Sequence, residues 1–228
     1  MIEIIGHRGA RGLEPENTIR SFKKALELGV DYIECDVHLT KDRHIVLIHD
    51  HTLDRTTNAT GNVNDYTFEE IRELDAGKGE KIPTLQELID LARGKVKLHI
   101  ELKDEKATEQ TIRIVEENDM VDQVFLTSGN TETIRKVREI NPSMSMEHIF
   151  GQPSEDAIER AVSVGAKRIS CHISHLTANF VQEAHENRLQ VIAWPPNTLE
   201  EAKKALECGV DLICTDRPDI VTRKALTR

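Results

Sequence analysis

The sequence lacks the excess of positive charge that nucleic-acid-binding proteins use. Its 30 lysines and arginines are outnumbered by 40 aspartates and glutamates, which gives a formal net charge of −10. Binding to nucleic acid and adsorption to anionic lipid both depend on Lys and Arg. The composition therefore argues against a nucleic-acid partner and against stable membrane association. Any phosphate bound here needs a local positive source, such as a cation with a few Arg or Lys.

Long apolar runs and closely spaced cysteines are also missing. No stretch reaches the ~18 apolar residues of a membrane-spanning helix. The four cysteines are Cys35, Cys171, Cys208 and Cys214, and none lies in a CxxC motif. We expect them to be free, buried thiols in a reducing compartment. Because the chain begins inside its first expected strand, without a signal peptide, we expect a cytoplasmic protein.

A short phrase recurs along the chain and indicates alternating helices and strands. Residues 25–33 read Ala-Leu-Glu-Leu-Gly-Val-Asp-Tyr-Ile, and residues 205–213 read Ala-Leu-Glu-Cys-Gly-Val-Asp-Leu-Ile, with a looser copy at 161–169. Each copy has the features of a last helical turn, a glycine just past it, and a strand. Repeated units of this kind predict a parallel sheet.

The whole chain divides into eight such units. The expected strands are Glu3–His7, Tyr32–Val37, Lys97–Lys103, Gln123–Ser128, Ser143–His148, Arg168–His172, Gln190–Trp194 and Asp211–Thr215. The expected helices are Glu16–Leu28, Thr84–Ala92, Thr131–Ile140, Ser154–Val164, Thr177–Glu186 and Thr198–Leu206. A chain of 228 residues suits an α/β barrel as one domain. We predict a single (β/α)8 TIM barrel domain over residues 1–228.

One segment departs from this alternation. The two strand-like runs within residues 35–50 are joined at Thr40–Arg43, a link too short for anything but an antiparallel hairpin. With Asp42 and Arg43 as a two-residue turn, Asp36 falls opposite His49. Residues 50–83 then form an insertion with one short helix at Phe68–Leu74. An insertion of this length is expected to cover or flank the functional site.

Three acidic side chains are expected to point into the barrel. Alternation along a strand places Glu34 and Asp36 on one face of the second strand, and Glu101 and Lys103 on one face of the third. Buried carboxylates repel one another, and a hard divalent cation with oxygen ligands relieves this repulsion. The pattern favours a metal site, with an internal salt-bridge cluster around Lys103 as the alternative.

Two histidines end apolar runs, where a polar side chain does not help a core to pack. His7 is followed by Arg8 and lies between Gly6 and Gly9, so a ligand can approach the backbone and meet a forked phosphate contact. His49 ends the returning strand of the hairpin. Two histidines with a pKa of about 6.5 can divide general base and general acid roles near neutral pH. These residues predict a metal-assisted hydrolase of phosphate or acyl groups.

Further positions leave two interpretations open. Residues 15–18, Pro-Glu-Asn-Thr, suit either the first turn of a helix or the active face of the barrel. Trp194 ends a strand and is either a wall of the pocket or an ordinary barrel aromatic. Four other polar residues lie at or past strand ends without a partner in the sequence: Glu147, His148, His172 and His175.

At these residues the chain resembles the glycerophosphodiester phosphodiesterase family. The motifs that carry the resemblance are Gly6-His7-Arg8-Gly9, Pro15-Glu16-Asn17-Thr18, Glu34-Cys35-Asp36-Val37, Ile48-His49-Asp50, Thr52-Leu53-Asp54-Arg55-Thr56-Thr57, Ile82-Pro83-Thr84-Leu85, Glu101-Leu102-Lys103 and Thr215-Asp216-Arg217-Pro218. They span nearly the whole chain in order. The resemblance implies a (β/α)8 barrel with an insertion after His49. It also implies hydrolysis of a small-molecule glycerophosphodiester to glycerol 3-phosphate and an alcohol.

The resemblance also implies a role for individual residues. The metal ligands would be Glu34, Asp36 and Glu101, with Mg²⁺ or Ca²⁺ as the ion. The acid–base pair would be His7, leaning towards the base, and His49, the acid. The phosphate would be contacted by Arg8 and Lys103. The chain departs from the family's usual pattern at residues 194–197, which read Trp-Pro-Pro-Asn where Trp-Thr-Val-Asn is usual, and at Arg43, where Gly is usual.

Three other functions use a similar set of residues. A lysophospholipase D-like enzyme would need apolar surface at the barrel mouth, and the polar stretch at residues 56–65 does not offer it. A metal-dependent sugar isomerase would not need Arg8 beside His7. An inactive barrel that only binds its ligand would not need His7, His49 and Glu101 together. The sequence leaves open the alcohol, the metal, and whether the chain forms a homo-oligomer.

Overall fold

Eight parallel strands close into a barrel in the computed structural model, which describes residues 2–227. Their order around the barrel is β1-β9-β8-β7-β6-β5-β4-β2, and β2 pairs with β1 to complete the circle. The strands are β1 (Glu3–Gly6), β2 (Tyr32–Leu39), β4 (Lys97–Leu102), β5 (Val124–Ser128), β6 (Ser145–Phe150), β7 (Arg168–His172), β8 (Gln190–Trp194) and β9 (Leu212–Thr215). The predicted (β/α)8 barrel is confirmed.

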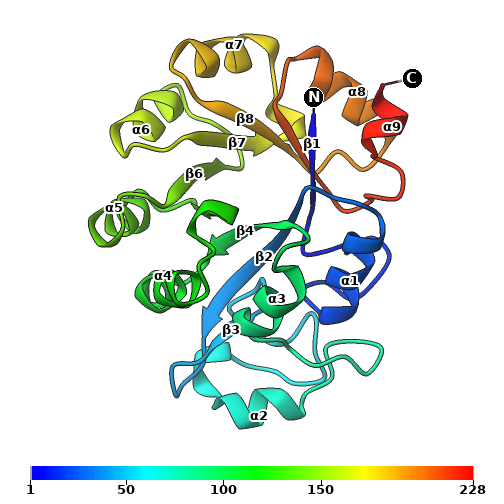
Figure 1. Cartoon of the computed structure of the whole chain (residues 1–228), viewed down its shortest axis with the longest axis vertical. Coiled ribbons are helices and arrows are strands. Elements are labelled where there is room, and N and C mark those ends of the chain that lie inside the picture. The colour runs from blue at the N-terminus through cyan, green and yellow to red at the C-terminus, as the bar shows by residue number, and fades with distance from the viewer. Residues whose placement is uncertain (1, 228) are drawn as a thin grey trace.

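Helices surround the barrel, one after nearly every strand (Figure 1). They are α1 (Ile19–Glu27), α3 (Leu85–Ala92), α4 (Thr108–Glu117), α5 (Thr131–Ile140), α6 (Ala157–Ser163), α7 (Ala178–Glu186), α8 (Leu199–Glu207) and α9 (Arg223–Leu226). The sequence analysis missed α4, because Thr108 and Thr111 supply half of its buried face and weaken the apolar periodicity. The strand expected from Ser143 begins at Ser145 instead, because a turn bonds Met144 N to Asn141 O.

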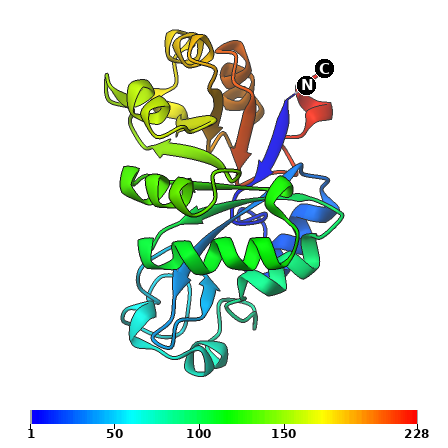
Figure 2. The same ribbon diagram turned by 60° about the vertical axis from the view of Figure 1, so that its left-hand side comes forward.

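The side chains of the strands divide between two layers. Ile33, Cys35 and Val37 of β2 face outwards and join the large core between barrel and helices. A smaller apolar cluster fills the inside of the barrel, from Ile5, Tyr32, Phe125, Ile192, Leu212 and Cys214. Figure 2 shows the helices outside and the strands at the centre. The predicted alternation, which leaves Glu34 and Asp36 facing inwards, is therefore confirmed.

The hairpin after β2 exists, but its register differs by one residue from the prediction. Strand β3 (Ile45–Leu47) runs antiparallel to β2, with Val37 opposite Leu47, so the ladder brings Ile48 and not His49 opposite Asp36. The turn is a three-residue loop at 41–43, closed by a hydrogen bond from Thr40 N to His44 O. Arg43 adopts a φ of 67°, as the last residue of such loops does. The prediction of a two-residue turn was therefore wrong.

The insertion at residues 50–83 packs beside β3 and projects beyond one end of the barrel (Figures 1 and 2). It contains a 3₁₀ turn, η1 (Val63–Asp65), and the short helix α2 (Phe68–Glu73). Thr67 and Glu70 cap the N-terminus of α2, each side chain bonding to the backbone N–H of the other. Its apolar side chains form a satellite core around Leu53 and Ile71, separate from the main core. The insertion thus folds around its own cluster of apolar residues.

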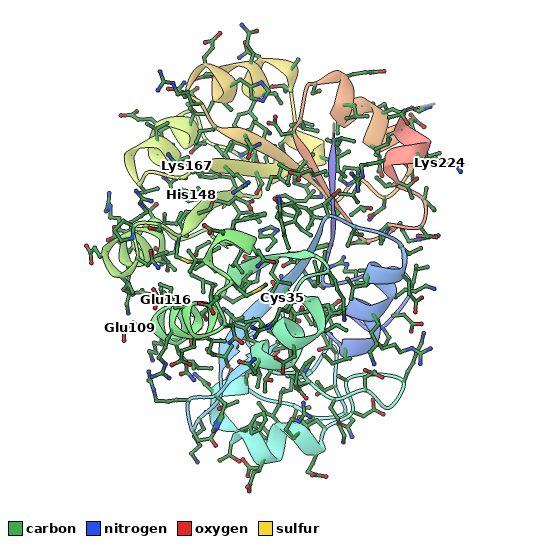
Figure 3. The ribbon with its side chains drawn as sticks, viewed as in Figure 1. Cys35, Glu109, Glu116, His148, Lys167 and Lys224 are labelled. Carbon is green, nitrogen blue, oxygen red and sulfur yellow. The ribbon has the colours of Figure 1, made fainter. Side chains whose placement is uncertain are left out.

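The surroundings of the cysteines and the charged residues follow this layering. The four cysteines are free, as expected, and only Cys208 is partly exposed. Figure 3 shows Cys35 on β2 in the interior, whereas Glu109 and Glu116 lie on α4 near the edge of the molecule. Within residues 2–227, no helix combines the length and the apolar character needed to cross a membrane.

Candidate active site

Three carboxylates meet at the C-terminal ends of β2 and β4. Glu34 and Asp36 extend from β2 and Glu101 from β4, where Asp36 and Glu101 are neighbours in register. One carboxylate oxygen from each lies within 4.8 Å of those of the other two. Hard divalent cations prefer clusters of oxygen donors such as this one. The predicted metal ligands therefore converge, and their chemistry fits such a cation.

The electrostatics of this cluster show strong repulsion between the carboxylates. Burial, reinforced by the charge of Asp36, raises the pKa of Glu34 well above its usual value. Burial and Asp36 also raise the pKa of Glu101 to about 6, against the opposing effect of Lys103. Burial acts in the same direction on Asp36, but Lys103 and Arg8 outweigh it and hold that pKa below its usual range. A divalent cation would relieve this repulsion.

Lys103 also makes the contacts that the salt-bridge alternative requires. Its Nζ lies 2.7 Å from Glu101 Oε1 and 3.5 Å from Asp36 Oδ1. Arg8 adds a second positive charge beside Asp36, but two positive charges do not balance three carboxylates, and Glu34 remains outside the contacts of Lys103. The structure thus combines the lysine contacts of a salt-bridge cluster with a group of carboxylate oxygens that could bind a cation.

The first histidine is held by a carboxylate from the far end of the chain. His7 Nδ1 lies 2.6 Å from Oδ1 of Asp216, which directly follows β9, and His7 Nε2 lies 3.9 Å from Glu34 Oε2. Burial lowers the pKa of His7 against the opposing hydrogen bond to Asp216. Because Asp216 accepts the Nδ1 hydrogen, the lone pair of the neutral imidazole lies on Nε2, towards the carboxylates.

Asp216 is a candidate site residue that the sequence analysis did not single out. It also forms an ion pair with Arg11 Nε at 2.8 Å and accepts a hydrogen bond from Asn197 Nδ2 at 2.9 Å. The available signal was its position directly after a strand, inside one of the recognised motifs. Its contact with His7 spans 209 residues of sequence, so no local pattern could reveal it.

The second histidine repeats this arrangement locally. His49 Nδ1 lies 2.6 Å from Oδ1 of its neighbour Asp50, and Arg55 Nε donates to Asp50 Oδ2 at 2.7 Å. Burial lowers the pKa of His49, although the charge of Asp36 opposes this. His49 reaches the site despite the shifted hairpin register, because β3 ends at Leu47 and the chain then leaves the sheet.

Arg8 connects several of these groups. Its backbone N–H donates to Glu34 Oε2 at 2.6 Å, at a backbone φ of 50°. Its guanidinium lies 2.7 Å from Glu16 Oε1 and 3.3 Å from Asp36 Oδ2. Arg8 therefore orients two of the candidate metal ligands, and it also lines the cavity into which the site opens.

Glu16 and Asn17 contact residues of the candidate site, and neither lies in the first turn of a helix. Helix α1 begins at Ile19 with Thr18 as its N-cap, so Glu16 and Asn17 precede it. Asn17 Nδ2 donates to Asp36 Oδ2 at 2.8 Å. Glu16 accepts hydrogen bonds from both Arg8 and Arg55. The expected helix start at Glu16 was therefore three residues early, and the active-face interpretation fits the contacts.

The site opens into a cavity of about 270 Å³. The expected site residues that line it are His7, Arg8, Glu34, His49, Glu101, Lys103 and Trp194. Of the four weaker candidates, only Glu147 lines this cavity, together with His99, which the sequence placed on the inner face of β4. His148, His172 and His175 are not among its lining residues.

Comparison with known proteins agrees with this geometry. The model of the glycerophosphoryl diester phosphodiesterase family matches residues 7–220. A glycerophosphodiester phosphodiesterase of Caldanaerobacter subterraneus subsp. tengcongensis is 35% identical over 95% of this chain and 94% of its own length.

Solved structures give the same result. A putative glycerophosphodiester phosphodiesterase from Galdieria sulphuraria superposes with a TM-score of 0.92 at 33% identity, covering 100% of this chain and 98% of its own. An Oleispira antarctica phosphodiesterase in complex with the product sn-glycerol-3-phosphate superposes with a TM-score of 0.90 at 26% identity, covering 99% and 95%. The chain therefore belongs to the glycerophosphoryl diester phosphodiesterase family, whose members are phosphoric diester hydrolases.

Proposed function

We propose that this chain is a divalent-cation-dependent glycerophosphodiester phosphodiesterase that releases glycerol 3-phosphate and an alcohol. The observation that carries the proposal is one cavity in which two histidines, each held by a carboxylate through Nδ1, flank a cluster of three carboxylates. The family match supports diester hydrolysis, and the Oleispira antarctica phosphodiesterase has sn-glycerol-3-phosphate as its product. We expect a small-molecule substrate and, from the sequence, a cytoplasmic location.

The cation would be held by Glu34, Asp36 and Glu101, whose oxygen donors suit Mg²⁺ or Ca²⁺. When bound, it supplies electrostatic stabilisation to the phosphodiester and to its more highly charged transition state. Asn17 and the backbone of Arg8 hold two of these carboxylates in place from outside the cluster. Such outer contacts fix the direction of a ligand before the ion arrives.

Lys103 and Arg8 would contact the phosphate. Both line the cavity, and both keep their positive charge, because the carboxylates around them raise the pKa of each despite burial. Lysine acts as a point charge, whereas arginine presents a planar fork to the phosphate oxygens. Trp194 would form a wall of the pocket beside them.

The two histidines would divide the proton transfers. His7 suits the base, because burial favours its neutral form and leaves Nε2 free to take a proton from water or from the adjacent glycerol hydroxyl. His49 would give a proton to the departing alcohol, and burial, which lowers its pKa against the opposing charge of Asp36, makes the protonated ring a stronger acid. Asp216 and Asp50 orient the two rings throughout.

Release of glycerol 3-phosphate from a panel of glycerophosphodiesters tests the activity. We expect release with several head groups, complete loss after exhaustive chelation, and recovery with Mg²⁺ or Ca²⁺. Full activity after chelation would contradict the cation, and absence of release from every diester would contradict the function itself.

Leaving-group dependence tests the histidine roles. His49→Ala and His7→Ala should each lower kcat by about 10²–10⁴-fold on a natural alkyl diester, and the double variant should lose much less than the product of the two. His49→Ala should lose less on a diester with an acidic leaving group such as p-nitrophenol, which departs without a proton. His44→Ala, at an exposed histidine of the hairpin, is the matched control and should keep full activity. If His7→Ala is instead the variant that loses less activity on the acidic leaving group, His7 is the acid and His49 is the base.

A further inference from the structure

A second acidic residue faces the cavity outside the metal cluster. Glu147 lies on the inner face of β6, its side chain is fully buried, and it lines the same cavity as the histidines. Neither carboxylate oxygen has a hydrogen-bond partner among residues 2–227. His99 Nε2 approaches Glu147 Oε2 to 2.9 Å, but out of line for a hydrogen bond. The ring of His99 is stacked on Phe125, with centroids 4.2 Å apart, and this holds the ring in that position.

An arrangement of this kind is costly unless a ligand completes it. A buried carboxylate without donors loses its hydration and gains no hydrogen bond in exchange. The imidazole of His99 lies close to one carboxylate oxygen, but no hydrogen bond satisfies either oxygen of Glu147. A hydrogen-bond donor on a substrate in the cavity would supply such a partner.

The register of the sheet fixes how far Glu147 lies from the reacting centre. Glu101 pairs with Thr127 of β5, and Thr127 pairs with Glu147 of β6. Two strand spacings separate Glu101 from Glu147, about 10 Å around the barrel wall, and both side chains point inwards. A three-carbon polyol with a phosphate at one end spans such a gap.

We propose that Glu147, with His99 behind it, accepts hydrogen bonds from the hydroxyl groups of the glycerol moiety and so selects glycerol diesters over other phosphodiesters. This inference rests on the proposed function and adds the residue that recognises the substrate. Ile192 and Cys214, both buried, line the same cavity. The glycerol, which all such diesters share, then lies at Glu147, and the alcohol of variable size points away from it.

The unpaired carboxylate of Glu147 suits the hydroxyl groups of a polyol. Hydroxyl groups donate without adding charge. A site built around a buried acceptor rejects analogues that lack the donor, because the acceptor is then left unpaired.

Binding of two small phosphates tests the proposal without any turnover. Calorimetry with Mg²⁺ present would compare glycerol 3-phosphate with n-propyl phosphate, which has the same chain and no hydroxyl groups. The wild-type protein should prefer glycerol 3-phosphate by about 10–100-fold. In Glu147→Ala this preference should fall below about 5-fold, because only the affinity for glycerol 3-phosphate decreases.

Two further variants guard the result against a loss of fold. Glu147→Gln keeps the size of the side chain and should lose part of the preference, so it serves if the alanine variant does not fold. His148→Gln is the matched control: His148 lies on the same strand and is equally buried, but it contacts Thr131 on the side of the helices (Figure 3). It should keep the full preference.

Other outcomes would overturn the inference. Equal weakening of both phosphates by Glu147→Ala would show that the residue only supports the barrel. Weaker binding of phosphoethanolamine, with glycerol 3-phosphate unchanged, would place the head group at Glu147. If both Glu147 variants keep diesterase activity and an unchanged preference for glycerol 3-phosphate, this inference alone is overturned. If the wild-type protein has no diesterase activity, the proposed function is overturned.

Discussion

Each histidine of the site is held by an aspartate on Nδ1, so the ring nitrogen that faces the cavity is Nε2 in both cases. For His7 that aspartate is Asp216, which Arg11 and Asn197 hold in turn. Such a contact fixes both the tautomer and the direction of the ring. The proposed roles of the two histidines therefore depend on the aspartates that orient their rings.

Replacing Asp216 tests this dependence. Asp216→Asn keeps the size of the side chain, but its amide can donate to His7 Nδ1 and stabilise the wrong tautomer. We expect kcat to fall by about 10²-fold or more with little change in KM. Asp219→Asn is the control, because Asp219 pairs with Arg217 at the surface and is not among the residues that line the cavity. Steady-state kinetics measure both, and unchanged kcat in Asp216→Asn would contradict the positioning role.

His148 illustrates how a buried histidine sets acid stability. Burial, assisted by the charge of Arg160, lowers its pKa to about 4 from an ordinary 6.5. The neutral form is favoured in the folded state, so its contribution is complete above pH 6.5 and decreases as the pH falls from 6.5 towards 4. Urea unfolding at pH 7 and pH 4.5 should show a smaller acid loss of stability for His148→Gln than for the wild type. An equal loss in both would refute this effect.

At the scale of elements, the hairpin and the helix starts show what local rules decide. Thr residues cap α1, α2, α3, α7 and α8, and each accepts a hydrogen bond from a backbone N–H in the first turn. The hairpin turn, in contrast, differs from the prediction by one residue, since Arg43 occupies a backbone conformation that favours glycine. The sequence analysis noted that glycine is usual at this position but did not infer the left-handed conformation, and hence the three-residue loop, from it.

The same conformation predicts a stabilising substitution. A residue other than glycine pays roughly 1–2 kcal/mol in the left-handed region, partly offset by the greater chain entropy of glycine. Arg43→Gly should therefore raise the free energy of unfolding by about 0.5 kcal/mol, and Arg43→Val should lower it. Lys41→Gly, in the same loop but without a positive φ, should not stabilise. Urea titrations would check the three, and a destabilised Arg43→Gly would contradict the argument.

For the whole molecule, the proposed cation would link the active site to the stability of the fold. An ion that binds only the folded state stabilises it by mass action, by about 2.7 kcal/mol at a hundred times its dissociation constant. Mg²⁺ or Ca²⁺ should therefore raise the melting temperature of the wild-type protein. The shift should disappear in Glu101→Gln and persist in Glu109→Gln, which removes an exposed carboxylate on α4 (Figure 3). An equal shift in all three would indicate nonspecific binding.

The sequence by itself determined the features that depend on short repeats in the chain. Alternation along β2 and β4 placed Glu34, Asp36 and Glu101 on inner faces, because a strand has a period of two residues wherever it lies. The recurring helix–glycine–strand phrase determined the parallel barrel in the same way. The short link after β2 determined that a hairpin follows, although not its register.

Only the tertiary structure decided which distant groups meet. Closure of the barrel between β1 and β9 brings Asp216 to His7, and the curvature of the sheet brings Glu147 against His99. The contact of Asn17 with Asp36 depends likewise on how the chain before α1 crosses the barrel mouth. These contacts have no local signal, because the free energy that fixes them comes from closing the whole ring of strands and not from the residues next to them in the chain.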